Sequence, residues 1–192
     1  MRVYKAEIPD VLIIEPDVYG DDRGYFYETF NRSRFAEQSG IEIDFVQDNE
    51  SKSRYGVVRG LHFQRDEFAQ TKLVHVAKGK ILDVAVDIRK NSPTYGKYVA
   101  TELSDVNHRQ LYIPRGFAHG FSVLSEEAVF QYKCDNYYAP HAEGGILWND
   151  PAIGIDWGLP AEDVLLSAKD AAHPLLKDAE YLFDYNVDYY AE

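Results

Sequence analysis

Polar side chains gather in one apolar stretch of the chain, residues 56–64, whose β-branched and aromatic residues are typical of a strand. His62 lies between two large apolar residues, Arg59 precedes it by three positions, and Gln64 follows it. A lone histidine in such a place is usually a packed residue with one hydrogen bond. An arginine, a histidine and a glutamine are costly to bury together without partners, so this stretch predicts a polar pocket.

Strict alternation along a strand would put Arg59 and His62 on opposite faces of the sheet. They can share a pocket only if the strand is irregular between them. Gly60 is the position where a bulge or twist is easiest, and we expect an irregularity there.

Residues far from this stretch could complete a site for proton transfer: Lys72, Tyr132 and Asp170. A histidine such as His62, held by the Asp170 carboxylate, has a fixed tautomer and a raised basicity, which suits a general base. Inversion of a carbon needs proton carriers on both of its faces, and the phenol of Tyr132 could be the acid on the face opposite the histidine. A lysine can hold the negative charge that develops on a carbonyl oxygen.

Each of these residues also has a purely structural interpretation. His119 could be a packed loop histidine, and Tyr132 one more core aromatic. Asp170 could cap a helix that begins at Ala171, and Arg23 could be a solvated charge in a turn. The functional interpretation therefore depends on the joint pattern.

Composition limits the classes of protein and partner. A chain of 192 residues is expected to form a single domain, residues 1–192. With 20 basic and 32 acidic side chains and no basic run, it offers no footprint for nucleic acid. The single cysteine, Cys134, suits a reducing compartment. Residues 1–10 lack an apolar signal core and no stretch could span a bilayer, so we expect a cytoplasmic protein without membrane contact.

Short strands separated by turn signals dominate the chain, which favours an antiparallel sandwich or barrel, and we expect an all-β jelly roll. Asn31 should cap a short helix that Gly40 ends. Residues 72–77 and 81–88 should pair as a hairpin around residues 78–80. One or two further short helices are expected between residues 165 and 185.

Five sequence blocks together resemble the dTDP-4-dehydrorhamnose 3,5-epimerase family, and they occur in the order typical of that family. They are Arg59-Gly60-Leu61-His62-Phe63-Gln64, Gln70-Thr71-Lys72-Leu73-Val74, Tyr112-Ile113-Pro114-Arg115-Gly116-Phe117-Ala118-His119-Gly120-Phe121, Trp148-Asn149-Asp150-Pro151 and Leu166-Ser167-Ala168-Lys169-Asp170.

The resemblance implies a cupin-type jelly roll, a homodimer, and a role in making dTDP-L-rhamnose. It implies that His62 is the base beside the C4 ketone, with Asp170 as its partner. Tyr132 would be the acid on the other face, and Lys72 would stabilise the enolate. The matching positions for binding the dTDP-sugar substrate are Arg23, Phe26, Glu28, Gln47, Asn49, Arg59, His119, Tyr138 and Lys169.

The resemblance implies no redox cofactor, and a metal site is not expected either. Many cupins carry a His-x-His pair on the central strand, whereas here His62 is followed by Phe63 and Gln64. The alternatives are a relative that inverts one carbon, a ketoisomerase of the same fold, a metal-dependent cupin oxygenase or isomerase, and a non-catalytic nucleotide-sugar binding module.

Overall fold

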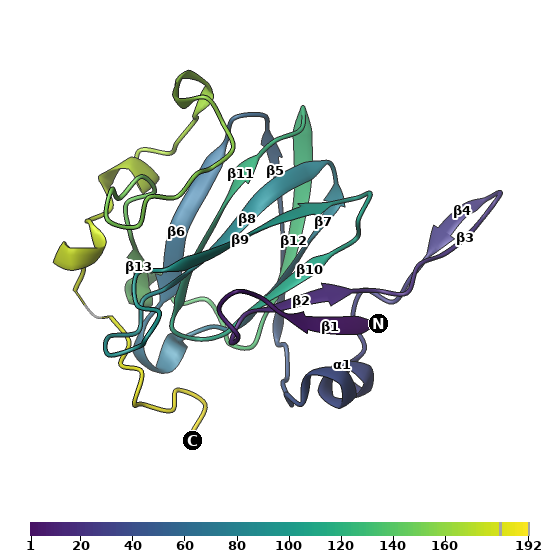
Figure 1. Cartoon of the computed structure of the whole chain (residues 1–192), viewed down its shortest axis with the longest axis horizontal. Coiled ribbons are helices and arrows are strands. Elements are labelled where there is room, and N and C mark those ends of the chain that lie inside the picture. Colours follow the sequence, from purple (N-terminus) through teal and green to yellow (C-terminus); the bar gives the residue numbers. More distant parts are fainter. Residues whose placement is uncertain (181, 192) are drawn as a thin grey trace.

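The computed structural model describes residues 1–180 and 182–191, and within these residues two antiparallel sheets pack face to face (Figure 1). The six-stranded sheet contains, in spatial order, β1 (Arg2–Lys5), β2 (Leu12–Glu15), β10 (Gln110–Ile113), β7 (Lys72–Lys78), β12 (Glu127–Cys134) and β5 (Gln47–Arg54). The five-stranded sheet contains β13 (Glu143–Gly145), β6 (Val58–Gln64), β11 (Phe117–Val123), β8 (Lys80–Asp87) and β9 (Tyr98–Ser104). This arrangement is the expected jelly roll.

A buried apolar core lies between the two sheets. Val74 and Phe130 from the six-stranded sheet pack with Ala85 and Phe121 from the five-stranded sheet. Successive side chains along each strand point alternately into this core and toward the outer face of the sheet.

The central strand β6 carries the irregularity expected at Gly60. In the pairing with β11, His62 lies opposite His119, but Arg59 lies opposite Phe121, so β6 has one extra residue in this interval. Gly60 has a φ of 114° and lies so close to Gly120 that a Cβ atom there would be 2.7 Å from the Gly120 Cα. The peptide bond that follows Gly60 is cis. The prediction of a bulge that depends on glycine is confirmed.

The helix α1 (Arg32–Ser39) begins and ends where the sequence predicts. The Asn31 side chain accepts a hydrogen bond from the Arg34 amide, and Gly40 ends the helix in the left-handed conformation. The buried ring of Phe35 packs α1 against Leu12, Ile14 and Tyr112 on the outer face of the six-stranded sheet.

The hairpin expected around residues 78–80 is wrong. Strand β7 pairs with β10 and β12, whereas β8 pairs with β9 and β11 in the other sheet. Gly79 is the only residue between the two strands, and its positive φ of 83° lets the chain turn a corner from one sheet to the other. A two-residue turn would be needed to fold the strands back on each other.

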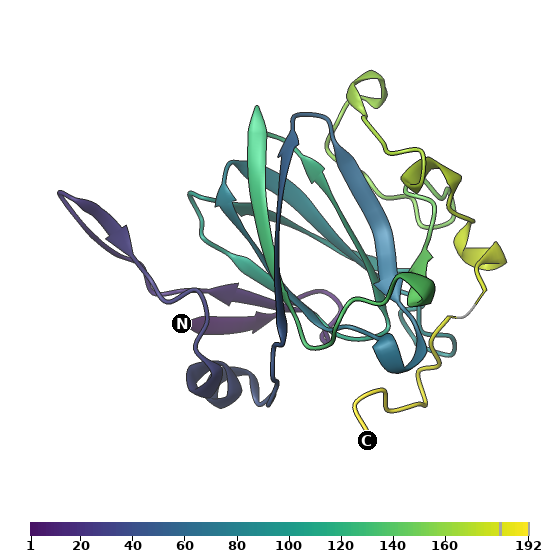
Figure 2. The same cartoon turned by 180° about the vertical axis from the view of Figure 1, so that it is seen from behind.

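Strands β3 (Tyr19–Asp21) and β4 (Gly24–Phe26) form a separate hairpin that projects away from the two sheets (Figures 1 and 2). Asp22 and Arg23 form the turn between the two strands. Tyr19, Tyr25 and Phe26 on this arm are all exposed, Phe26 to 68%.

The C-terminal part of the chain, from residue 146 onward, lies along the outer face of the five-stranded sheet beside β6 (Figure 2). Trp157, Leu176 and Phe183 pack there against Leu61 and other apolar residues. The one or two short helices expected between residues 165 and 185 are three-residue 3-10 helices at Asp170–Ala172 and Leu176–Asp178, and a third such helix precedes them at Ala161–Asp163. Among the described residues, no helix is long and apolar enough to cross a membrane.

Candidate active site

A short hydrogen bond joins the two residues that the sequence analysis paired as base and partner. The Nε2 atom of His62 lies 2.5 Å from Oδ1 of Asp170. His62 belongs to β6, and Asp170 begins a 3-10 turn in the C-terminal segment that covers this strand. The pairing uses Nε2, so Nδ1 is the ring nitrogen left to exchange a proton.

Asp170 is buried and is held from both sides. Its Oδ2 accepts a hydrogen bond from the Ser167 hydroxyl at 2.8 Å, and the Ser167 Oγ accepts one from the Asp170 amide at 3.0 Å. Burial raises the pKa of the Asp170 carboxyl, but the hydrogen bonds from His62 and Ser167 and the charge of His62 outweigh it, so the pKa is lowered. An ionised Asp170 keeps the proton of His62 on Nε2.

His62 borders a cavity of about 260 Å³ between the two sheets. The residues that line it are Gln47, Asn49, His62, Phe63, Gln64, Gln70, Lys72, Tyr132, Cys134, Tyr138 and Glu143. His62 comes from the five-stranded sheet, whereas Lys72 and Tyr132 come from the six-stranded sheet. The predicted base and the predicted acid therefore face one cavity from opposite walls.

Lys72 lies beside the ring of Tyr132, with its Nζ atom 5.6 Å from the ring centroid. Burial lowers the pKa of the Lys72 ammonium, while the nearby thiol of Cys134 and the carboxylates of Asp83 and Glu143 act in the opposite direction. Among the described residues, no carboxylate forms an ion pair with Lys72, so its charge is directed at the cavity.

Burial raises the pKa of the Tyr132 phenol, with a smaller opposing effect from the charge of Arg59. Tyr132 therefore keeps its proton over a wide pH range and can donate it. The Tyr132 ring packs against Phe130, with 5.5 Å between centroids. Tyr132 is therefore both an aromatic residue of the core and a phenol that lines the cavity.

Arg59 is exposed, and the extra residue in β6 between Arg59 and His62 sets its place on the strand. Its Nε donates a hydrogen bond to the Ser53 hydroxyl of β5 at 3.1 Å. Gln47 and Asn49 lie on the same inner face of β5, where the Gln47 amide donates to Asn49 at 2.9 Å. Gln47 and Asn49 thus line the cavity, whereas Arg59 does not, although its charge acts on the Tyr132 phenol.

Tyr138 and Lys169 meet at Glu143, which sequence reasoning missed. The Tyr138 hydroxyl donates to Glu143 at 3.0 Å, and Lys169 forms an ion pair with the same carboxylate. Burial raises the pKa of Glu143, but the hydrogen bonds from Lys169 and Tyr138 more than reverse this, so the pKa is lowered. Tyr138 lines the cavity and is half exposed, whereas Lys169 lines a neighbouring cavity that shares Glu143.

His119 lies opposite His62 on the neighbouring strand, but its surroundings are different. Its Nε2 lies 2.8 Å from Oδ1 of Asp83, and both side chains are buried. The His119 ring stacks on Phe130, with 5.9 Å between centroids. The sequence did not indicate Asp83, because alternation alone does not reveal which carboxylate faces His119.

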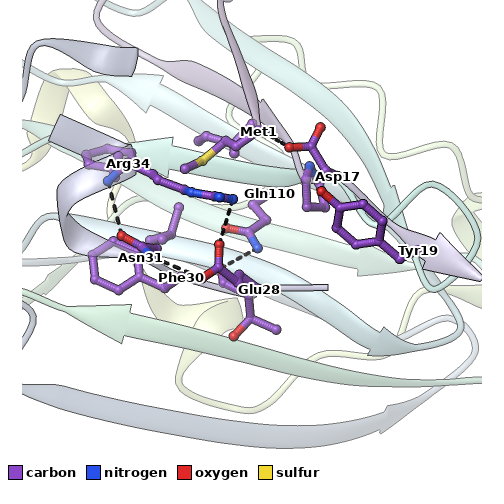
Figure 3. A pocket seen from close by; sticks show the side chains of 13 residues that line it. Met1, Asp17, Tyr19, Glu28, Phe30, Asn31, Arg34 and Gln110 are labelled. Atoms are coloured by element: carbon purple, nitrogen blue, oxygen red, sulfur yellow. Dashed lines mark hydrogen bonds and ion pairs between the residues drawn. The ribbon is translucent and has the colours of Figure 1, made fainter. Parts of the chain in front are cut away.

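Arg23, Phe26 and Glu28 lie outside the cavity of their own chain. Arg23 is at the tip of the β3–β4 arm, where its side chain is 89% exposed and pairs with Asp21. Glu28 instead binds Arg34 at 2.8 Å and Asn31 at 3.0 Å beside a different cavity (Figure 3). That cavity measures about 20 Å³, room for about one water molecule, so it cannot hold a sugar.

The sequence analysis also missed Gln64, Gln70 and Cys134, which line the cavity, and Ser167 and His173, which lie beside Asp170. Gln64, Gln70 and Ser167 fall in the sequence blocks already noted, so their position there was an available signal, whereas Cys134 and His173 fall outside the blocks. His173 follows Asp170 by three residues, a spacing that places both side chains on one side of a turn.

The chain matches known proteins over most of its length. A sequence profile described as dTDP-4-dehydrorhamnose 3,5-epimerase matches residues 5–178. The dTDP-4-dehydrorhamnose 3,5-epimerase of Salmonella typhimurium is 60% identical over 93% of this chain and 97% of that protein.

Solved structures give the same result. A dTDP-6-deoxy-D-glucose-3,5-epimerase from Legionella pneumophila, in complex with dTDP-4-keto-L-rhamnose, is 50% identical with a TM-score of 0.93, covering 97% of this chain and 99% of that one. A 3'-monoepimerase from Streptomyces bikiniensis, in complex with dTDP-quinovose, is 30% identical with a TM-score of 0.87, covering 96% and 93%. The expected cupin-type jelly roll is confirmed.

Proposed function

The chain belongs to the dTDP-4-dehydrorhamnose 3,5-epimerase family and is an isomerase, and we propose that it inverts C3 and C5 of dTDP-4-dehydro-6-deoxy-D-glucose. The product would be dTDP-4-dehydro-L-rhamnose, the precursor that a reductase converts to dTDP-L-rhamnose. The observation that carries this proposal is the His62–Asp170 pair, which faces Tyr132 and Lys72 across one cavity.

The first step is removal of a proton beside the C4 ketone. His62 accepts this proton on Nδ1, while Asp170 stabilises the imidazolium that forms. The electron pair of the broken C–H bond moves into the carbonyl to give an enolate. Lys72 holds the enolate oxygen, and its poorly solvated charge is more effective there than it would be in water.

The second step returns a proton to the opposite face of the same carbon. Tyr132 is suited to this step because it approaches from the other sheet and because burial keeps its phenol protonated. C3 and C5 both flank the C4 carbonyl, so one set of residues can act on each carbon in turn. The reaction as written needs no redox cofactor.

The nucleotide part of the substrate would bind at the rim of the cavity. Arg59 supplies positive charge for the diphosphate, and Gln47 and Asn49 supply amides. Tyr138 offers an exposed ring for stacking on the base, with Lys169 beside it. His119 is buried beside Asp83 and does not line the cavity, so we assign it no direct contact with the sugar.

Arg23, Phe26 and Glu28 fit this proposal only if a second copy of the chain takes part. Their arm extends away from its own sheets, and its exposed aromatic residues suit burial against another surface (Figure 2). The enzyme would then be a homodimer in which each arm completes the site of the partner. Mixing Arg23→Ala chains with His62→Ala chains should restore activity, because a mixed dimer then contains one intact site. No recovery in verified mixed dimers would contradict this arrangement.

The central test is incubation with dTDP-4-dehydro-6-deoxy-D-glucose in heavy water without added metal. NMR would follow deuterium at each ring carbon while a reductase traps the L-lyxo product. We expect label at both C3 and C5. Label at one carbon would favour the second candidate, a single-carbon epimerase, which the likeness to the 3'-monoepimerase supports. Binding without exchange would indicate a binding module, and exchange only with added metal would indicate a metal-dependent cupin.

A further inference from the structure

His173 is a buried histidine whose ring nitrogen has no use in the chemistry described above. Its Nε2 atom is inaccessible to solvent and has no hydrogen-bond partner among the described residues. The ring rests on the backbone of Gly145, where a Cβ atom would be 2.3 Å from it. A buried nitrogen without a partner costs free energy, so its position requires an explanation.

The unpartnered nitrogen points toward the pair proposed as base and partner. Nε2 of His173 lies 3.8 Å from Oδ1 of Asp170, too far for a hydrogen bond, and the rings of His62 and His173 pack edge to face at 5.5 Å. One donor atom from each of His62, Asp170 and His173 lies within 4.8 Å of the others. Two imidazoles and one carboxylate are a ligand set typical of zinc and related transition metals.

We propose that His62, Asp170 and His173 form an inhibitory binding site for a divalent transition metal of the zinc class. Ligands of a tetrahedral zinc ion lie about 3.4 Å apart, given metal–ligand distances of about 2.1 Å. The His62–Asp170 distance of 2.5 Å would have to open, and the Asp170–His173 distance of 3.8 Å would have to close. The side chain of His62 is 30% exposed and has room to turn.

Metal binding would inactivate the base through its tautomer. The free enzyme carries the His62 proton on Nε2, against Asp170, and keeps the lone pair of Nδ1 for the substrate. Coordination through Nε2 needs a lone pair on that nitrogen, so the proton moves from Nε2 to Nδ1. No proton is then gained or lost by the imidazole, but Nδ1 can no longer accept one. This consequence rests on the proposed function of His62, whereas the metal site itself does not.

A second cavity of about 620 Å³ borders the site on the side of His173 and is lined by His173, Glu143, Gly145 and Lys169 among other residues. Nε2 of His173 is itself buried, so the ring has to move for an ion to enter from this cavity. A water molecule from the cavity would be the fourth ligand. Mg²⁺ and Ca²⁺ prefer oxygen ligands, so a site with two imidazole nitrogens should not bind them well.

Cobalt titration of the full-length, metal-stripped protein tests the site without using activity. We expect one equivalent of Co²⁺ to give a saturable visible band, which Zn²⁺ removes and Mg²⁺ does not. His173→Gln should weaken Co²⁺ binding by about tenfold or more, and His62→Gln should weaken it as well. His141→Gln is the matched control, because His141 is exposed and lies outside the cluster, and it should bind like the unchanged protein.

A missing band, or a band that His173→Gln and His62→Gln leave unchanged, would overturn the metal site. In the activity arm, Zn²⁺ should slow deuterium exchange, and each variant is compared with its own metal-free rate. Exchange that continues at full rate with the site saturated would overturn the inhibitory effect and the role of His62 as base. A metal-free protein that never exchanges deuterium would overturn the proposed function alone, because the cobalt titration would still report on the site.

Discussion

Two His–Asp pairs lie side by side in this protein, and only one of them is open to a cavity. His62 and His119 are register neighbours on β6 and β11, and each bonds an aspartate through Nε2, at 2.5 Å and 2.8 Å. The His62 side chain is 30% exposed, whereas that of His119 is 8% exposed and stacks on Phe130. The same pair of residue types can therefore serve as a base or as a buried anchor, depending on access.

The two aspartates also differ in how they are satisfied. Asp170 binds His62 with one oxygen and Ser167 with the other. Asp83 binds His119 with one oxygen, and its other oxygen is buried without a partner among the described residues. The negative charge of Asp83 instead favours the charged form of Lys72. The open pair is thus the one that we propose for proton transfer, whereas the buried pair contributes the Asp83 charge that acts on Lys72.

Replacing each histidine gives the largest expected contrast. His62→Ala should slow deuterium exchange at both C3 and C5 by about 10²–10⁴-fold, because the general base is lost. His119→Ala should keep exchange detectable at both carbons. It should instead lower the free energy of unfolding by about 1–3 kcal/mol, because Asp83 loses its hydrogen-bond partner. Full activity in His62→Ala would show that the base has been wrongly assigned.

Tyr132→Phe tests the wall opposite the open pair. The variant keeps the ring that packs on Phe130 but loses the proton, so stability should change little. Exchange of substrate protons should continue, while the formation of inverted product falls by about 10²-fold. NMR of residual substrate and trapped product separates the two rates. Equal loss of both rates would mean that Tyr132 does not act as the acid.

The two aspartates should respond differently to pH. Asp170→Asn should lower the rate by about 10–100-fold at all pH values, because the tautomer of His62 is no longer fixed. Asp83→Asn removes a negative charge that raises the pKa of Lys72, so that pKa should fall further. The alkaline limb of the kcat/KM profile should then move to lower pH. An unchanged alkaline limb in Asp83→Asn would assign that limb to another group.

Lys72→Met gives the smallest expected change in stability, and a change of the opposite sign. Burial lowers the pKa of Lys72 in the folded protein, so the unfolded chain keeps this proton to higher pH. The charged lysine therefore lowers the free energy of unfolding at neutral pH. This loss disappears as the pH rises toward the pKa of the lysine in the unfolded chain. Lys72→Met should be more stable by about 1 kcal/mol near neutral pH, or about 2–4 °C in Tm, and almost inactive. Thermal unfolding at two pH values checks the sign, and lower stability at neutral pH would contradict it.

Local sequence determined the features whose causes are local. Asn31 and Gly40 fixed the ends of α1, because a side-chain cap and a left-handed glycine act within one turn. Gly60 was indicated as the bulge because Arg59 and His62 could not otherwise share a face. The blocks that contain His62, Lys72 and Asp170 indicated the family, which the comparisons confirm.

Only the tertiary structure decided features that depend on partners distant in the chain. Residues 72–88 look like a hairpin by pattern, yet β7 and β8 belong to different sheets because their partners lie elsewhere in the sequence. The pairing of His119 with Asp83, the direction of the β3–β4 arm and the approach of His173 to Asp170 were likewise hidden. Alternation tells which face a side chain takes, but packing between distant segments decides what it meets there.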